Sequence, residues 1–112
     1  MTNKELIISF YQEFFNNHDI ESAKKYVAED YIQHNPGVLQ GRQGLMDGFR
    51  EKFISDPDFK LRIEKLIAED DMVVVYLKNI DTKGNTKCRV VDIYRIQNGM
   101  LAEHWDVLQP VK

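Results

Sequence analysis

Residues 90–108 read VVDIYRIQNGMLAEHWDVL, two runs rich in β-branched and aromatic residues on either side of Asn98-Gly99. Such runs are typical of strands, and an Asn-Gly pair between them is typical of a tight hairpin turn. The stretch therefore predicts two antiparallel strands, Thr86–Ile96 and Met100–Leu108, of which the second should end at Pro110. This hairpin is the fixed point from which the rest of the chain can be interpreted.

Toward the N-terminus, the alternation of apolar and polar residues that is typical of strands continues for one more hairpin. Phe59, Leu61 and Ile63 alternate with charged residues, and after Asp70-Asp71 the segment Met72–Ile80 is again rich in β-branched residues. Lys83-Gly84-Asn85 is a further turn signal. We therefore expect an antiparallel meander of four strands in the second half of the chain.

The first half has helical periodicity instead. Apolar residues recur at helical spacing from Asn3 to Asn16, again from Asp19 onward, and again from Arg42 to Ile54. Between the last two helices, Tyr31–His34 is a short segment with strand character. Helices that precede the strands in this way predict an α+β fold with three N-terminal helices packed on one face of an antiparallel sheet.

The composition narrows the class of protein. The 112 residues suit one domain, 1–112, and 43% hydrophobic with 29% charged residues excludes a disordered chain. A net charge of −3 without a basic block argues against nucleic-acid binding. The longest apolar run, Met72–Leu77, is too short to span a membrane. The single cysteine, Cys88, excludes a disulfide framework and favours a cytoplasmic protein.

Three motifs together resemble one known family. Asp30–Pro36 after two helices, Val91–Arg95, and Glu103–Val107 after Asn98-Gly99 resemble the SnoaL-like proteins of the nuclear-transport-factor-2-like (NTF2-like) superfamily. The resemblance is closest to the branch described as predicted SnoaL-like, aldol-condensation-catalysing enzymes. It implies a cone in which a strongly curved sheet and the helices enclose a pocket, with dimerisation through the outer face of the sheet. Tyr76 departs from the family, because many relatives have a histidine there.

The register of the hairpin decides which side chains face that pocket. A two-residue turn at Asn98-Gly99 would place Asp92 opposite Trp105, whereas a three-residue loop with a bulge at Gly99 would place Asp92 opposite His104. We favour the bulge, because it gathers Asp92, His104 and Asp106 on one face. The opposite face then carries a mostly apolar set that needs a partner: Val91, Ile93, Leu101, Trp105 and Val107.

These placements suggest cofactor-free acid/base chemistry on a small apolar carbonyl compound. Asp106 or Asp92 would be the base that removes a proton next to the carbonyl, because an apolar pocket disfavours a charged carboxylate. His34, His104 or Tyr76 would donate a hydrogen bond to the developing enolate. Ligand-lining residues would be Phe14, Phe49, Phe53, Tyr76 and Tyr94. Three histidines without helical His-x-x-His spacing argue against a zinc site, although His34, Asp92 and His104 could gather around a metal. The sequence has no nucleotide fingerprint, so we expect no cofactor.

Two further expectations complete the interpretation. The same pocket would equally suit a non-catalytic small-ligand-binding or dimerisation module, since the sequence does not separate binding from turnover. The apolar outer face around Trp105 predicts a homodimer, with a monomer in which Trp105 packs under Gln109–Lys112 as the less favoured alternative.

Overall fold

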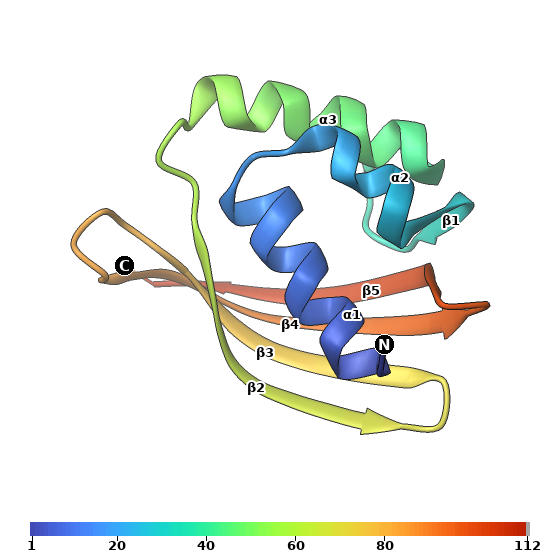
Figure 1. Ribbon diagram of the computed structural model, residues 1–112. Coiled ribbons are helices and arrows are strands. Elements are labelled where there is room, and N and C mark those ends of the chain that lie inside the picture. Colours follow the sequence, from blue (N-terminus) through green and yellow to red (C-terminus); the bar gives the residue numbers. More distant parts are fainter. Residues whose placement is uncertain (112) are drawn as a thin grey trace.

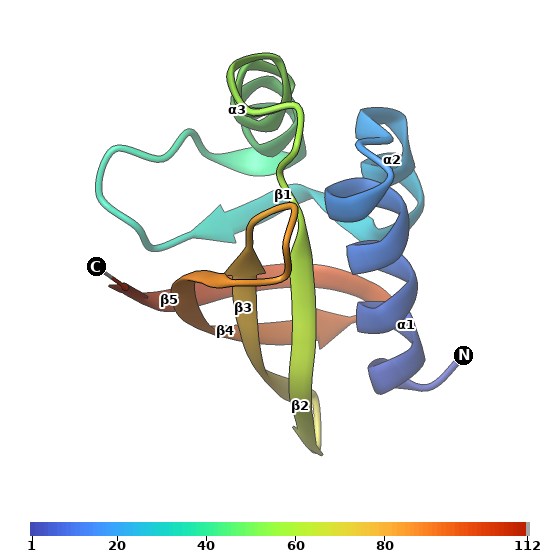
Figure 2. The ribbon, with the colours of Figure 1, turned by 90° about the vertical axis from the view of Figure 1, so that its left-hand side faces the viewer.

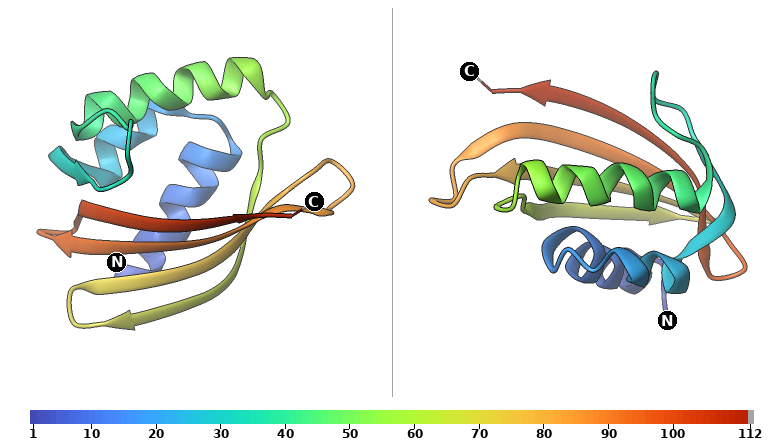
Figure 3. Two further views of the ribbon diagram at one scale, coloured as in Figure 1. Left: turned by 180° about the vertical axis from the view of Figure 1, so that it is seen from behind. Right: turned by 90° about the horizontal axis from the view of Figure 1, so that it is seen from above.

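Five strands form one sheet in the order β1-β5-β4-β3-β2, and helices cover one of its faces (Figure 1). The computed structural model describes residues 1–111. The strands are β1 (Val27–Gln33), β2 (Leu61–Glu69), β3 (Met72–Ile80), β4 (Thr86–Gln97) and β5 (Met100–Pro110). The helices are α1 (Asn3–Phe10), its π-helical continuation η1 (Tyr11–Asn16), the short 3₁₀ turn η2 (Ile20–Ser22), α2 (Ala23–Tyr26) and α3 (Gly41–Ser55). Figures 2 and 3 show α1 and α3 on the same side of the sheet.

The α+β architecture and the meander β2-β3-β4-β5 agree with the sequence analysis, but the sheet is mixed rather than antiparallel. β1 pairs in parallel with β5, with Gln33 next to His104. A parallel neighbour needs a crossover connection, which here is the long path through α3 and the meander. The expected short segment Tyr31–His34 therefore overlaps the end of a longer strand, β1, which ends at Gln33. β1 is the edge strand of the sheet and lies next to His104 on β5.

The N-terminal helix begins as predicted and then changes its geometry. Thr2 and Glu5 form the expected capping box. From Tyr11 the helix widens to π geometry, and Tyr11, Phe14 and Phe15 are all buried. Tyr11 stands four residues after Ile7 and Phe15 four residues after Tyr11, so these rings continue the buried face of α1. The second helix is shorter than expected, and Val27 belongs to β1 instead.

The predicted three-residue hairpin loop with a bulge at Gly99 is wrong. Asn98 and Gly99 both have positive φ, 55° and 72°, and Gln97 pairs with Met100, which makes a two-residue turn. An irregularity follows within β5, where Ile96 pairs with Leu101 but Arg95 pairs with Glu103. This bulge shifts the register by one residue.

The shift restores the predicted face but not the predicted pairs. Asp92 lies opposite Asp106, and Tyr94 lies opposite His104. Leu101 was expected on the outer face, yet it is completely buried, because the bulge turns it into the core. Asp92, His104 and Asp106 nevertheless share the face that the helices cover.

Helix and sheet meet in an aromatic core. The buried rings are Phe10, Phe14, Phe15, Phe53 and Phe59, with Phe49 packed against them. Within residues 1–111, no helix is both long and apolar enough to cross a membrane.

Candidate active site

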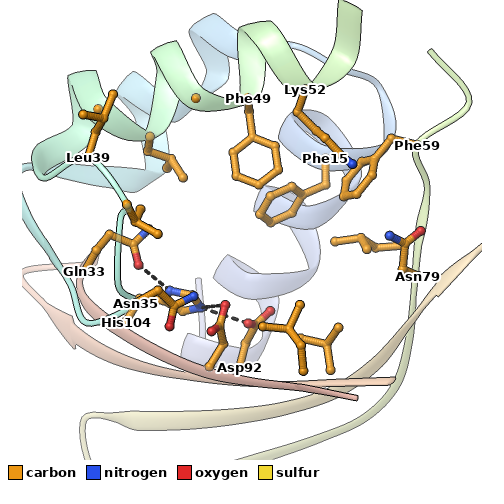
Figure 4. Close-up of a pocket in the computed structure, with 18 of the residues that line it drawn as sticks. Phe15, Gln33, Asn35, Leu39, Phe49, Lys52, Phe59, Asn79, Asp92 and His104 are labelled. Carbon is orange, nitrogen blue, oxygen red and sulfur yellow. Dashed lines mark hydrogen bonds and ion pairs between the residues drawn. The ribbon is translucent and has the colours of Figure 1, made fainter. Parts of the chain in front are cut away.

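A cavity of about 570 Å³ opens between α3, the loop after β1 and the inner face of the sheet (Figure 4). Its polar end contains Gln33, Asn35, Asp92, His104 and Asp106. The walls are largely apolar and include Phe15, Leu39, Leu45, Phe49, Phe59, Leu77 and Val90. Concave, mostly apolar cavities with a few polar groups at one end are the usual form of small-molecule sites.

Asp92 and His104 form a buried hydrogen-bonded pair at the polar end. His104 Nε2 donates to Asp92 Oδ1 at 2.9 Å, and the other ring nitrogen, Nδ1, lies 2.6 Å from Gln33 Oε1. Tyr11 from η1 donates its hydroxyl to the second oxygen of Asp92. A carboxylate oxygen only accepts, so Nε2 carries a hydrogen, and Nδ1 contacts the side-chain amide of Gln33. Asp92 is thus fully occupied by protein donors.

Asp106 is the unsatisfied carboxylate of the site. Its Oδ2 lies 3.9 Å from His104 Nε2, and within residues 1–111 its buried Oδ1 has no hydrogen-bond partner. Burial raises the pKa of Asp106 above its usual value and the charge of Asp92 adds to this, although Asn35 and His104 act in the opposite direction. Asp106 is therefore the group in this network that is free to accept a proton.

Three tyrosines surround the pair. Burial, together with the charge of Asp92, raises the pKa values of Tyr11, Tyr31 and Tyr94 well above the usual value. The Tyr94 hydroxyl lies 2.9 Å from that of Tyr11, and its ring lies 4.7 Å from that of His104. The neutral Tyr11 hydroxyl anchors Asp92, and the rings of Tyr31 and Tyr94 pack near the ring of His104.

The pocket contains some of the expected residues and not others. Asp92, His104, Asp106, Tyr94 and Phe49 line it. Phe14 and Phe53 are buried in the aromatic core behind the wall.

The predicted pocket location of His34 is wrong. His34 is exposed, its Nε2 lies 2.7 Å from Glu103 Oε2, and its ring stacks on Trp105 at 4.7 Å. Successive strand residues point to opposite faces, so Gln33 enters the pocket and His34 leaves it.

Tyr76 is misplaced for the same reason. Its neighbours Val75 and Leu77 are fully buried on the inner face, so Tyr76 points to the outer face. A donor role for Tyr76 in the pocket is therefore excluded by its position.

A family model described as SnoaL-like polyketide cyclase matches residues 5–112. The chain belongs to the SnoaL-like polyketide cyclase family. The search of curated proteins returned no match for this SnoaL-like chain. Its NTF2-like fold, by contrast, is shared by many solved structures.

Three of these structures illustrate how far the likeness extends. TsrD from Streptomyces laurentii is 24% identical with a TM-score of 0.78, over 95% of this chain and 87% of that one. IdmH from Streptomyces antibioticus is 18% identical with a TM-score of 0.78, over 97% and 93%. An NTF2-like protein of unknown function from Cytophaga hutchinsonii is 20% identical with a TM-score of 0.79, over 98% and 92%. At these identities the likeness establishes the fold alone.

Sequence reasoning missed three residues of the SnoaL-like site. Gln33 contacts His104, Tyr11 contacts Asp92, and Asn35 lines the polar end. A signal for Gln33 existed, because strand alternation allows only one of Gln33 and His34 to face inward. A signal for Tyr11 existed as well, because it shares the i, i+3, i+4, i+7 spacing of one helix face with Ile7, Phe10 and Phe14.

Asp92, His104 and Asp106 are also the described residues that could hold a metal ion. One ligand atom from each lies within 4.8 Å of the others. Two of these three atoms, Asp92 Oδ1 and His104 Nε2, are already joined by a hydrogen bond. These two atoms therefore already satisfy each other within the protein.

Proposed function

We propose that this SnoaL-like protein removes a proton next to a carbonyl group of a small apolar substrate, as in an aldol cyclisation or an isomerisation. The observation that carries the proposal is the pairing of two carboxylates with different surroundings. Asp92 is held by Tyr11 and His104, whereas Asp106 has an unpartnered oxygen within the described residues and a raised pKa. Carboxylates whose environments differ in this way are typical of acid/base pairs.

Asp106 would accept the proton as the C–H bond breaks, and the electron pair of that bond would move onto the substrate oxygen to give an enolate. The Asn35 amide at the same end of the pocket supplies a donor for this oxygen, whereas the Nε2 hydrogen of His104 is already donated to Asp92. In a cyclase the enolate carbon would then attack a second carbonyl of the same molecule, and the new alkoxide would take up the proton held by Asp106, which regenerates the carboxylate. Asp92 would be a positioning residue, since it holds His104 next to Asp106.

A panel of ketones and polyketide-like esters in deuterium oxide tests the proposal. We expect deuterium to replace hydrogen next to the carbonyl in at least one compound that binds, measured by NMR against a protein-free control. Compounds that bind without exchange or turnover would instead support the non-catalytic ligand-binding alternative, which the same pocket would serve.

The pH dependence of kcat/KM should report the state of Asp106. Because burial raises the pKa of this carboxyl, the base becomes available only above the ordinary aspartate value of about 4. We expect the acidic limb of the profile to have its midpoint above that value. A limb at or below about 4 would mean that a solvated carboxylate is the base.

We also propose that the outer face of the sheet forms a homodimer. Val107 is 68% exposed and Ile67 is 58% exposed, and Trp105 stacks on His34 beside the Arg95–Glu103 ion pair. Exposed apolar groups around an aromatic anchor are typical of interfaces.

Sedimentation of wild type and Trp105→Ala at micromolar concentration tests the dimer. We expect a wild-type dimer that dissociates in the variant, because the Trp105 ring would lie within the interface. Phe53→Leu, which alters the core on the opposite side of the sheet, should remain dimeric. A monomeric wild type would refute the dimer, and a dimeric Trp105→Ala would place the interface elsewhere.

A further inference from the structure

The pocket has a second polar end that the proposed chemistry does not use. Asn79 on β3 lies opposite Cys88 on β4, and both line the cavity. Figure 4 shows Asn79 beside Phe59, remote from Asp92 and His104. Among residues 1–111, the buried Oδ1 of Asn79 has no hydrogen-bond partner. This oxygen is an acceptor shielded from the cavity, so the group of Asn79 that can donate to a ligand is the amide nitrogen, which Figure 4 shows on the side of the pocket.

The two polar ends are separated by an apolar stretch. Cys88 and Asp92 are four positions apart on β4, which corresponds to roughly 13 Å at the usual rise of a strand. Leu77, Val90 and the Phe15 and Phe49 rings line the space between these ends. A ligand that contacts both ends therefore needs an apolar body, such as a fused ring system, with a polar group at each end.

Lys52 adds a positive charge at the Asn79 end. It lines the pocket from α3, and its ammonium group lies 5.6 Å from the centre of the Phe59 ring. Its one acidic neighbour among the salt bridges of the described chain is Asp56, at a loose 3.9 Å, and Asp56 is also paired with Lys87 at 3.5 Å. Lys52 is thus only weakly neutralised, although the exposed Glu51 also reaches this rim.

We propose that Lys52 and Asn79 form a subsite for a carboxylate carried at the far end of the substrate, so that the substrate is an apolar, ring-containing keto acid. The ammonium and the amide nitrogen both donate, and a carboxylate offers two accepting oxygens. The inference rests on the proposed function, because that function places the reacting carbonyl at Asp106.

Matched probes separate charge from shape. The probes are an acetylnaphthalene with a carboxylate on the ring remote from the acetyl group, its methyl ester, and the unsubstituted acetylnaphthalene. We expect the acid to bind wild type about tenfold more tightly than the ester by calorimetry, the value of one charge-assisted hydrogen bond. This preference should shrink in high salt, because Lys52 is partly exposed.

Substitutions at this end of the pocket test which residues cause the tighter binding of the acid than of its ester. Lys52→Met should abolish the preference for the acid without weakening the ester, and Asn79→Leu should weaken both. Cys88→Ala, at the same end of the pocket, and Glu51→Gln, which changes a charge at the same rim, should both keep the preference. Equal affinity of acid and ester for wild type would overturn the proposal, as would a preference that survives Lys52→Met or the failure of all probes to bind.

This outcome is independent of turnover. Binding is measured equally well with Asp106→Asn, which keeps the size of the side chain but removes the proposed base. Retained acid preference without any proton exchange would leave the subsite standing and refute the proposed function. Proton exchange without a preference for the acid would refute the subsite and leave the proposed function standing.

Discussion

Asp106→Asn is expected to lower kcat/KM by about 10²–10⁴-fold, the usual contribution of a general base. The substitution keeps the shape of the side chain and removes the carboxylate that would accept the substrate proton. Steady-state kinetics on a substrate found in the ketone panel checks this result. A variant with wild-type kcat/KM would remove Asp106 from the mechanism.

The same substitution should not destabilise the protein at pH 7. Burial raises the folded-state pKa of Asp106, so the folded protein favours the neutral carboxyl and loses stability as pH rises through that pKa. Asparagine is always neutral and avoids that loss. We expect Asp106→Asn to have a melting temperature equal to or above that of wild type at pH 7, with any gain disappearing toward acid pH, where the wild-type carboxyl is protonated.

Asp92→Leu is expected to lower the free energy of unfolding by about 3 kcal/mol, because it leaves buried donors without an acceptor. Those donors are the Tyr11 hydroxyl and His104 Nε2. Asp106→Leu is the matched control, since Asp106 lies directly opposite Asp92 and has an oxygen without a partner in the described chain. It should unfold close to wild type in urea. Equal unfolding midpoints for the two leucine variants would contradict the assignment of Asp92 as the structural member of the pair.

The strands were predictable because their signals are local. Met72–Ile80 has the predicted bounds, and Asn98-Gly99 forms the turn from which the hairpin starts. The parallel pairing of β1 with β5 was not predictable, because it depends on contacts between segments about 70 positions apart, such as Gln33 and His104.

The inner face was identified correctly through a wrong register. A bulge was expected at Gly99, but the structure has a two-residue turn and a bulge at Ala102. Both arrangements put Asp92, His104 and Asp106 on the same face. Position in a strand is thus more predictable than the pairing across it. The wrong pairing led to one wrong placement: Leu101 was assigned to the outer face, but it is buried.

Site residues were predicted best where strand alternation alone places them. Asp92, Tyr94 and His104 follow the alternation of their strands and line the pocket. His34 was assigned to the pocket on the resemblance. Strand alternation allows only one of Gln33 and His34 to face inward, and in the structure it is Gln33. Tyr11 was missed although it shares a helix face with Ile7, Phe10 and Phe14, because the pattern marks a buried position and does not show that its hydroxyl reaches Asp92.

The most direct test of the central claim is deuterium incorporation into one bound ketone, compared between wild type and Asp106→Asn in deuterium oxide at pH 7. The claim that Asp106 removes the proton predicts exchange next to the carbonyl in wild type and none above the protein-free background in the variant, with equal affinity for the ketone. Exchange at the same rate in both proteins would contradict it.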